Sequence, residues 1–223
     1  MKFIDNDDLL RKHLNSASVR RYFPAQLDRH FQLASLRQNE QIIRQGEKSA
    51  YLYYLLSGRC KVSAVMENGR TVIINSLEAP CLIGEIELIN RDVPFSVESI
   101  TEVLLLALPV DKARDSLLNS PDFLYQLCSD LVDKERTHAI RLAHYVSFPL
   151  INRLAQFILT NSTPEGMQIK KTVIAESLGV SYRHLEKVMN DLVSQGTLEK
   201  QKRNYRIIKA EYLRSLAQQM EVF

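Results

Sequence analysis

Short apolar runs separated by glycines occupy residues 36–109. Gly46, Gly58, Gly69 and Gly84 are 12, 11 and 15 residues apart, a spacing typical of short strands joined by tight turns. The segments between them are rich in aromatic, aliphatic and β-branched residues, which favour strands. The pattern therefore predicts an antiparallel β-roll or barrel.

One turn of this roll has a strong local signal. Asn68-Gly69 lies between apolar segments at residues 62–66 and 72–74, and Asn-Gly favours a tight hairpin turn. A last strand over residues 103–108 is followed by Pro109. We expect the roll to end there.

The apolar spacing changes after Pro109 to alternating steps of four and three residues, and no glycine occurs between residues 111 and 146. The predicted seam is Leu124, Cys128, Leu131, Glu135, His138, Leu142 and Tyr145. Such a seam predicts a long helix that pairs with its own copy in a parallel dimer. A helix packed on its own roll would produce a similar stripe and is the alternative.

Ser147-Phe148-Pro149 interrupts this helix, because proline lacks an N–H donor and disfavours helical geometry at the preceding residue. We therefore expect a sensor domain with N-terminal helices and the β-roll over residues 1–109, a dimerisation helix over 110–146 and a compact C-terminal domain over 147–223.

Residues 172–193 (TVIAESLGVSYRHLEKVMNDLV) predict a helix, a short turn and a second helix. The apolar stripe is Ile174, Leu178, Val180, Leu185, Val188 and Leu192. Gly179 can adopt the left-handed conformation of the turn, and Ser181 is a favourable N-cap. We interpret this segment as a helix-turn-helix, whose second helix enters the major groove of DNA. A helical hairpin without DNA contacts is the alternative.

The second helix supplies the expected base contacts, which are Tyr182, Arg183, His184 and Lys187. After it, a basic β-hairpin over residues 196–208 resembles a wing. Phosphate contacts are expected from the start of the first helix, because helix N-termini favour anions, and from the wing. These residues are Lys170, Lys171, Thr172, Lys200, Lys202 and Arg203, and the same set includes Ser181 and Asn190 from the second helix.

Charge supports a polyanionic partner only because it is unevenly distributed. The 223 residues carry a net charge of +3. Residues 170–209 contain nine Lys or Arg and four acidic residues, so this segment carries +5 and the remainder −2. A local basic excess is typical of nucleic-acid binding, although a solvated charged face would look similar.

Several other classes of protein are disfavoured. The first ten residues lack the features of a secretory signal, and the longest apolar run is far shorter than the ~20 residues of a membrane helix. We therefore expect a cytoplasmic protein without a membrane partner. Cys60, Cys81 and Cys128 have no metal-ligand spacing, which favours structural cysteines.

Taken in order, a β-roll, a long helix and a winged helix-turn-helix resemble the Crp/Fnr superfamily of bacterial transcription regulators. Local strings are most similar to the YeiL branch of that superfamily: NGR (68–70), APCLIGEIELI (79–89), LALP (106–109), SFPLINRLA (147–155) and LGVSYRHL (178–185). The resemblance implies an α+β fold with a cyclic-nucleotide-binding-like roll (a double-stranded β-helix), and a homodimer on two-fold symmetric double-stranded DNA. It also implies an effector or redox input at the roll that the long helix transmits. If the protein is an activator, RNA polymerase is a further expected partner.

The resemblance places a candidate effector pocket at Gly84, Glu85, Ile86, Phe95, Ser96, Glu135 and His138. Phe95 stands where cyclic-AMP-binding members have arginine, so the guanidinium partner of the cyclic phosphate is missing. His138-Ala139 replaces the Thr-Ser that meets the base. We therefore expect no tight cyclic-AMP binding. An iron-sulfur cluster usually needs four cysteines, and three are present, so none is expected.

The recognition helix also departs from the family pattern. Tyr182-Arg183 stands where the resemblance expects Arg-Glu, and Lys187 replaces a following Arg. The Glu that accepts from cytosine is lost, so we expect a different preferred DNA sequence. Arg183 is the candidate for bidentate recognition of guanine.

Two other functions are compatible with parts of the pattern. A cupin-like enzyme shares the barrel, but its metal needs histidines inside it, and none of the five histidines lies between residues 31 and 137. Because no catalytic motif is evident, we expect no enzymatic activity. A sensor or partner-binding module without DNA is the second alternative; salt distinguishes it, since DNA binding weakens steeply with salt.

Overall fold

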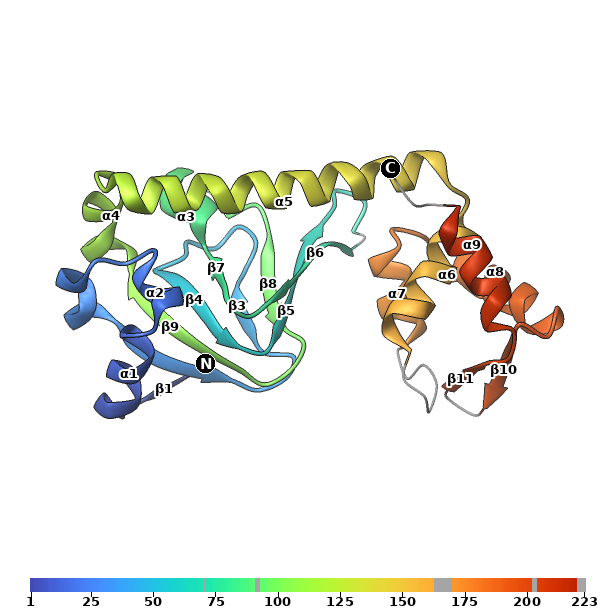
Figure 1. Cartoon of the computed structure of the whole chain (residues 1–223), viewed down its shortest axis with the longest axis horizontal. Coiled ribbons are helices and arrows are strands. Elements are labelled where there is room, and N and C mark those ends of the chain that lie inside the picture. Colours follow the sequence, from blue (N-terminus) through green and yellow to red (C-terminus); the bar gives the residue numbers. More distant parts are fainter. Residues whose placement is uncertain (70, 91–92, 163–169, 202–203, 220–223) are drawn as a thin grey trace. The chain divides into compact units, whose positions relative to one another are not determined.

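The computed structural model describes residues 1–69, 71–90, 93–162, 170–201 and 204–219, and only the backbone of Arg141 and Tyr145 (Figure 1). The chain forms two compact units, residues 1–132 and 133–223. Each unit is described by itself.

The first unit contains the predicted roll and N-terminal helices. Its strands are β1 (Lys2–Ile4), β2 (Gln32–Leu36), β3 (Gln41–Ile43), β4 (Tyr51–Ser57), β5 (Arg59–Val65), β6 (Thr71–Glu78), β7 (Cys81–Ile83), β8 (Ser96–Ser99) and β9 (Val103–Pro109). Its complete helices are α1 (Asp7–Leu14), α2 (Ala17–Arg20), the 3₁₀ helix η1 (Ala25–His30), α3 (Glu85–Asn90) and α4 (Val110–Leu118).

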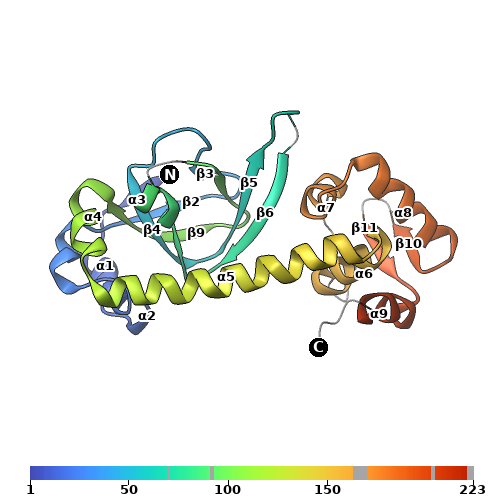
Figure 2. The same ribbon diagram turned by 90° about the horizontal axis from the view of Figure 1, so that it is seen from above.

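The strands form two antiparallel sheets. One has the order β1-β2-β9-β4-β7 and the other β3-β8-β5-β6. The pairing of β5 with β6 confirms the predicted hairpin, in which Gly69 has φ +74° (Figure 2). Gly58, between β4 and β5, is required by space as well as by its φ of +92°, because a Cβ there would lie 2.4 Å from the carbonyl oxygen of Glu102.

The five-stranded sheet is covered on both faces, which explains why β9 is an unbroken apolar run. Leu105 and Ala107 pack in one cluster with Cys60 of the four-stranded sheet. Leu106 and Leu108 point the other way, into a cluster with residues of α1, η1 and α4. α1 and α4 lie at the same end of the first unit in Figures 1 and 2.

The helix predicted over residues 110–146 is two helices, α4 and α5 (Pro121–Ser147). α4 ends at Leu118 and Pro121 begins α5, where its missing N–H breaks no helical hydrogen bond. The Ser120 hydroxyl accepts from the backbone N–H of Phe123 at 3.4 Å. The prediction of one continuous helix was wrong because it relied on apolar spacing and the absence of glycine.

The start of α5 is fastened to the first unit. Phe123 and Leu127 are buried in the cluster with the N-terminal helices. The Tyr22 hydroxyl donates to the Asp130 carboxylate, and burial, followed by this hydrogen bond, raises the pKa of Tyr22. The chain after α2 therefore holds α5 by both apolar and polar contacts.

A row of exposed side chains runs along α5 with alternating steps of three and four residues. The row is Tyr125, Cys128, Val132, Glu135, Ala139, Leu142 and Val146. Tyr125, Val132, Leu142 and Val146 are between 64% and 82% exposed. The predicted seam shares Cys128, Glu135 and Leu142 with this row. It was wrong at Leu124, which packs against the core of the first unit.

The second unit contains the rest of α5, followed by the predicted compact helical domain with one buried core. Its remaining elements are α6 (Leu150–Asn161), α7 (Lys171–Ser177), α8 (Tyr182–Ser194), β10 (Leu198–Gln201), β11 (Asn204–Ile207) and α9 (Ala210–Gln218). The interruption predicted around Pro149 is confirmed, since α5 ends at Ser147 and α6 begins at Leu150.

Two side chains of α6 tie the second unit together. The buried Asn152 amide donates to the carbonyl oxygen of Leu216 at 2.9 Å and to the side chain of Gln219 at 2.7 Å. The Arg153 guanidinium donates to the carbonyl oxygen of Leu178, at the end of α7, at 3.0 Å. α6 thus supports both α9 and the turn that precedes α8.

Candidate nucleic-acid interface

The helix-turn-helix is confirmed at the level of backbone geometry. Gly179 has φ +62°, the left-handed conformation that glycine adopts without steric cost. The N–H of Val180 donates to the carbonyl oxygen of Ala175 at 3.0 Å. These features end α7 and redirect the chain into α8.

Ser181 is the N-cap of α8, as predicted. Its hydroxyl oxygen accepts from the backbone N–H of His184 at 3.2 Å, which satisfies one of the donors that a helix N-terminus leaves unpaired. The first turn of α8 is therefore held by a side chain of the protein itself, with Tyr182, Arg183 and His184 exposed.

Burial of one stripe of α8 decides which side chains face outward. Leu185, Met189 and Leu192 are fully buried. At about 100° per residue, Arg183 and Lys187 lie on the opposite side, and both are exposed. Sequence reasoning missed Met189 and included Val188, which is half-buried.

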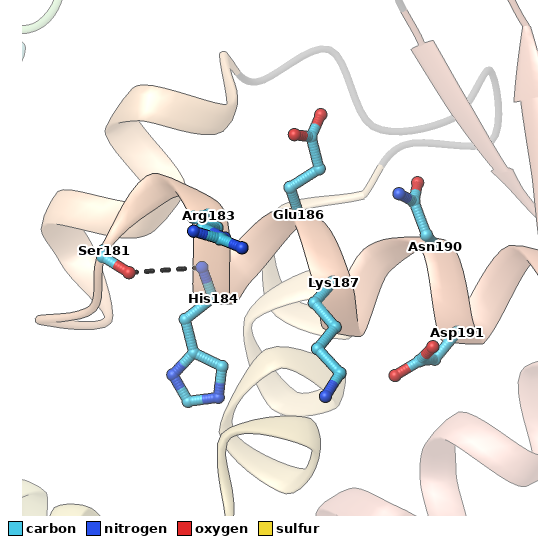
Figure 3. A pocket seen from close by; sticks show the side chains of 7 residues that line it. All are labelled: Ser181, Arg183, His184, Glu186, Lys187, Asn190 and Asp191. Carbon is cyan, nitrogen blue, oxygen red and sulfur yellow. Dashed lines mark hydrogen bonds between the residues drawn. The ribbon is translucent and has the colours of Figure 1, made fainter.

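The outward side of α8 carries an open depression (Figure 3). It is lined by Ser181, Arg183, His184, Glu186, Lys187, Asn190 and Asp191. In Figure 3, Glu186 and Asn190 leave the helix along one edge, and His184, Lys187 and Asp191 along the other. Glu186 and Asp191 were not among the predicted site residues, because acidic side chains were counted only against the local charge.

The predicted phosphate contacts at α7 differ in their surroundings. Lys170 and Thr172 are exposed, whereas the Lys171 ammonium pairs with the Glu186 carboxylate at 2.9 Å. Burial by itself would lower the pKa of Lys171, but its hydrogen bond to Glu186 and the nearby Tyr205 raise it. Lys171 is therefore charged and already paired within the protein.

The predicted wing is confirmed as a hairpin. β10 pairs antiparallel with β11 from Leu198 opposite Ile207 to Gln201 opposite Asn204. Lys200 is exposed on β10. Lys202 and Arg203, also predicted to contact phosphates, lie outside the described residues.

Comparison with known proteins assigns both halves of the chain. Residues 33–120 match the cyclic nucleotide-binding domain family, and residues 152–216 match the Crp-like helix-turn-helix domain family. The regulatory protein YeiL of Escherichia coli O157:H7 is 42% identical over 181 residues, which cover 81% of this chain and 83% of that protein. The chain belongs to the Crp/Fnr family. It is a DNA-binding transcription regulator.

Other similar proteins agree with this assignment. The cAMP-activated global transcriptional regulator CRP of Salmonella typhimurium is 26% identical over 168 residues, covering 70% of this chain and 80% of that one. A Crp/Fnr-family structure from Eubacterium rectale shares the fold with a TM-score of 0.78 at 14% identity, over 94% of this chain and 97% of that one. In the described parts of this Crp/Fnr protein, no helix could span a membrane.

The candidate effector residues of this Crp/Fnr protein lie in both units. Gly84 is buried with φ +98°, and a Cβ there would lie 3.3 Å from the carbonyl oxygen of Tyr51. It precedes α3, which begins with Glu85 and Ile86, both half-buried. The left-handed Gly84 thus allows the chain to turn closely past Tyr51 before α3 begins.

The remaining candidate effector residues differ in exposure. Phe95 and Ser96 are half-buried at the start of β8, and the Ser96 hydroxyl accepts from the backbone N–H of Gln45 at 3.0 Å. On α5, in the second unit, Glu135 is exposed and His138 half-buried. A shared pocket for these residues and those of α3 stays a prediction.

Sequence reasoning missed a buried carboxylate in α3. Glu87 is 8% exposed. Burial raises the pKa of Glu87, the N–H of its own backbone lowers it, and the nearby Glu85 raises it again. The alternation of acidic and apolar residues in Gly84-Glu85-Ile86-Glu87-Leu88 could not show which Glu is buried.

The three cysteines occupy different surroundings. Cys60 is fully buried, and burial raises its pKa to about 11. Cys81 is half-buried in β7, and Cys128 is exposed on α5. In the described ranges, no group of three or more His, Cys, Asp or Glu side chains is arranged to hold a metal ion.

Replacing Ser181 by Ala should lower the free energy of unfolding by about 1 kcal/mol, because α8 loses its N-cap. Urea denaturation measures the loss. Ser194→Ala is the matched control, since Ser194 is at the other end of α8 and donates to the carbonyl oxygen of Asp191; its effect should stay within about 0.5 kcal/mol. Equal losses would contradict the capping role.

Replacing Glu87 by Gln should stabilise the protein more at pH 7 than at pH 4. A folded-state pKa above that of the unfolded chain gives a contribution that is present at low pH and lost as pH rises through the folded-state pKa. Glutamine removes this dependence. Urea midpoints at both pH values test this prediction. Glu78→Gln is the control, because Glu78 is an exposed residue of β6. A pH-independent difference for Glu87→Gln would show that ionisation is not its cause.

Proposed function

We propose that this protein regulates transcription as a homodimer that reads a two-fold symmetric DNA site through α8. The observation that carries the proposal is the outward face of α8, where Arg183, Lys187 and Asn190 follow one another at i, i+4 and i+7 on a capped helix. This arrangement fits a helix lying in the major groove with its N-terminal residues at base edges.

Individual roles follow from side-chain chemistry. Arg183 can donate two hydrogen bonds to guanine O6 and N7. Tyr182, His184 and Lys187, all exposed, contact neighbouring bases. Ser181 and Asn190, at the ends of this surface, contact the backbone.

Phosphates on either side of the groove are the partners of the surrounding cations. Lys170 and Thr172 precede or begin α7, and Lys200 lies on the wing; all three are exposed. Lys202 and Arg203 belong to the same predicted set. Contacts of this kind supply affinity and register without sequence information.

The second copy of the chain is proposed to cover the exposed row on α5. Its alternating three- and four-residue steps are those of a parallel coiled coil, and large apolar side chains rarely stay open to water in such a row. A dimer would place two recognition helices on half-sites about one helical turn, ~34 Å, apart.

An input at the roll is proposed to set DNA affinity. It would act through α5 and the break at 147–149, which requires two states with different effector contacts. Phe95 cannot form the bidentate contact of an arginine to a cyclic phosphate, so the proposed effector is not cyclic AMP. RNA polymerase is the additional partner if the protein activates transcription.

Selection of bound fragments from random DNA by the purified protein tests the proposed function. An inverted repeat with half-sites one turn apart is the expected product. Recovery without enrichment of any sequence would contradict sequence-specific recognition.

Replacing Arg183 by Ala should abolish the preference for guanine at one position of each half-site, a loss of about 1 to 3 kcal/mol of discrimination. Arg183→Lys is the matched variant: it keeps a positive charge but loses the planar fork, so the preference should fall while the salt dependence is retained. Binding to a site library measures both. Uniform weakening with an unchanged preference would reassign Arg183 to the DNA backbone.

Replacing Leu142 by Lys should dissociate the dimer, because a charge would replace a large apolar side chain in the exposed row of α5. We expect at least a tenfold weaker dimer by sedimentation. Thr137→Lys adds the same charge two residues after Glu135, away from the row, and should leave the dimer intact. A parent protein that is monomeric at micromolar concentration would contradict the proposed seam.

A further inference from the structure

Lys171 is the meeting point of three elements of the second unit. It is the first residue of α7, and its ammonium lies 2.9 Å from the Glu186 carboxylate of α8. The same nitrogen lies 5.9 Å from the centre of the Tyr182 ring and 5.8 Å from that of Tyr205 on β11. These distances are within the range of cation–π attraction.

The residues of this cluster differ in burial: Lys171 and Tyr205 are largely buried, whereas Glu186 and Tyr182 are partly open to solvent. The Lys171 side chain is 17% exposed, against 43% for Glu186, and the neighbouring Lys170 is exposed. Tyr205 is buried in the core of the second unit, so one of the two rings beside the ammonium is held in place. The other ring, of Tyr182, is 46% exposed at the first position of α8.

Glu186 strengthens the same arrangement from the recognition helix. Its pKa is lowered first by the hydrogen bond and charge of Lys171, and then by Lys200 of the wing and the Tyr182 hydroxyl. The carboxylate one turn after Tyr182 is thus neutralised within the protein. Without this cation, it would present a negative charge beside the proposed path of the DNA.

We propose that Lys171 and Glu186 are positioning residues that hold the Tyr182 ring for base recognition, and that Lys171 does not contact a phosphate. This inference rests on the proposed function of α8. The Lys171 ammonium contacts the Tyr182 ring, the buried Tyr205 ring and the Glu186 carboxylate. The orientation of Tyr182, the first base-reading side chain, therefore depends on a residue of the preceding helix. Lys171 therefore affects the preference of the protein for particular DNA sequences more than its overall affinity for DNA.

The two roles of Lys171 predict opposite behaviour. A phosphate contact contributes about 0.9 to the slope of log affinity against log salt and nothing to sequence preference. Removing Glu186 would then release a cation and strengthen binding to every sequence. A positioning residue contributes little to the slope, and removing either partner changes the preference at the base pair that Tyr182 reads.

The experiment measures binding of the full-length protein to a site library at several salt concentrations. Tyr182→Ala first identifies the base pair read by Tyr182. Lys171→Gln and Glu186→Gln should each reduce the preference at that base pair by about threefold or more, and neither should add to the effect of Tyr182→Ala. Lys171→Arg retains the charge and should restore the preference.

Lys170→Gln is the matched control, because it removes an exposed lysine one residue away. It should lower the salt slope by about 0.9 and leave the preference unchanged. Urea denaturation confirms that each variant is folded. If Lys171→Gln is not, Glu186→Gln still separates the two roles, because only a phosphate contact predicts stronger binding to every sequence.

The inference is overturned if Lys171→Gln behaves like Lys170→Gln, or if Glu186→Gln strengthens binding to all sequences equally. Failure of the proposed function is a different result, since the parent protein would then select no sequence at all. A parent that selects a sequence, with variants that alter only the salt slope, would leave the function standing and reject the positioning role.

Discussion

Burial of a single apolar stripe of α8 is the interaction on which the DNA-binding surface depends. Leu185, Met189 and Leu192 are enclosed by α6, α7, α9 and the wing in one core. Because side chains leave a helix at fixed angles around its axis, burial of this stripe also fixes the direction in which Arg183 and Lys187 project. The Ser181 cap completes the first turn of α8, which carries Tyr182, Arg183 and His184.

In the first unit, the core buries one side of the start of α5 and leaves the other side exposed. The five-stranded sheet is packed on both faces, and its outer face receives the N-terminal helices, α4 and the start of α5. Phe123, Leu124 and Leu127 are used in this packing, with Asp130 held by Tyr22. The other side of the same helix leaves Tyr125, Cys128 and Val132 exposed. A monomer therefore carries an apolar row that its own core does not cover, which is the physical basis of the proposed dimer.

Electrostatics in the second unit shows that a basic segment is not a uniform surface. Lys170 and Lys171 are adjacent in the sequence, yet Lys170 is exposed, whereas Lys171 is paired with Glu186 and lies near two tyrosine rings. A similar contrast occurs in α3, where Glu87 is buried and its neighbour Glu85 is half-buried. Desolvation and pairing, rather than residue type, decide which of these charges can meet a ligand.

The order of roll, long helix and helix-turn-helix was determined by the sequence alone, because periodicity, the Asn68-Gly69 turn, Gly179 and the Ser181 cap act over a few residues. The outward position of Arg183 and Lys187 followed from the same local rules. The break between α4 and α5 is also local, at Ser120-Pro121, although the apolar spacing did not show it. Tertiary structure decided what depends on contacts between distant segments: the packing of Leu124 and the burial of Glu87. It also brought Lys171 to Glu186 and Tyr205, across 15 residues in one case. Such contacts form only when α7 packs against α8 and the wing folds back onto both. Residue spacing and net charge do not show where these packing contacts will be.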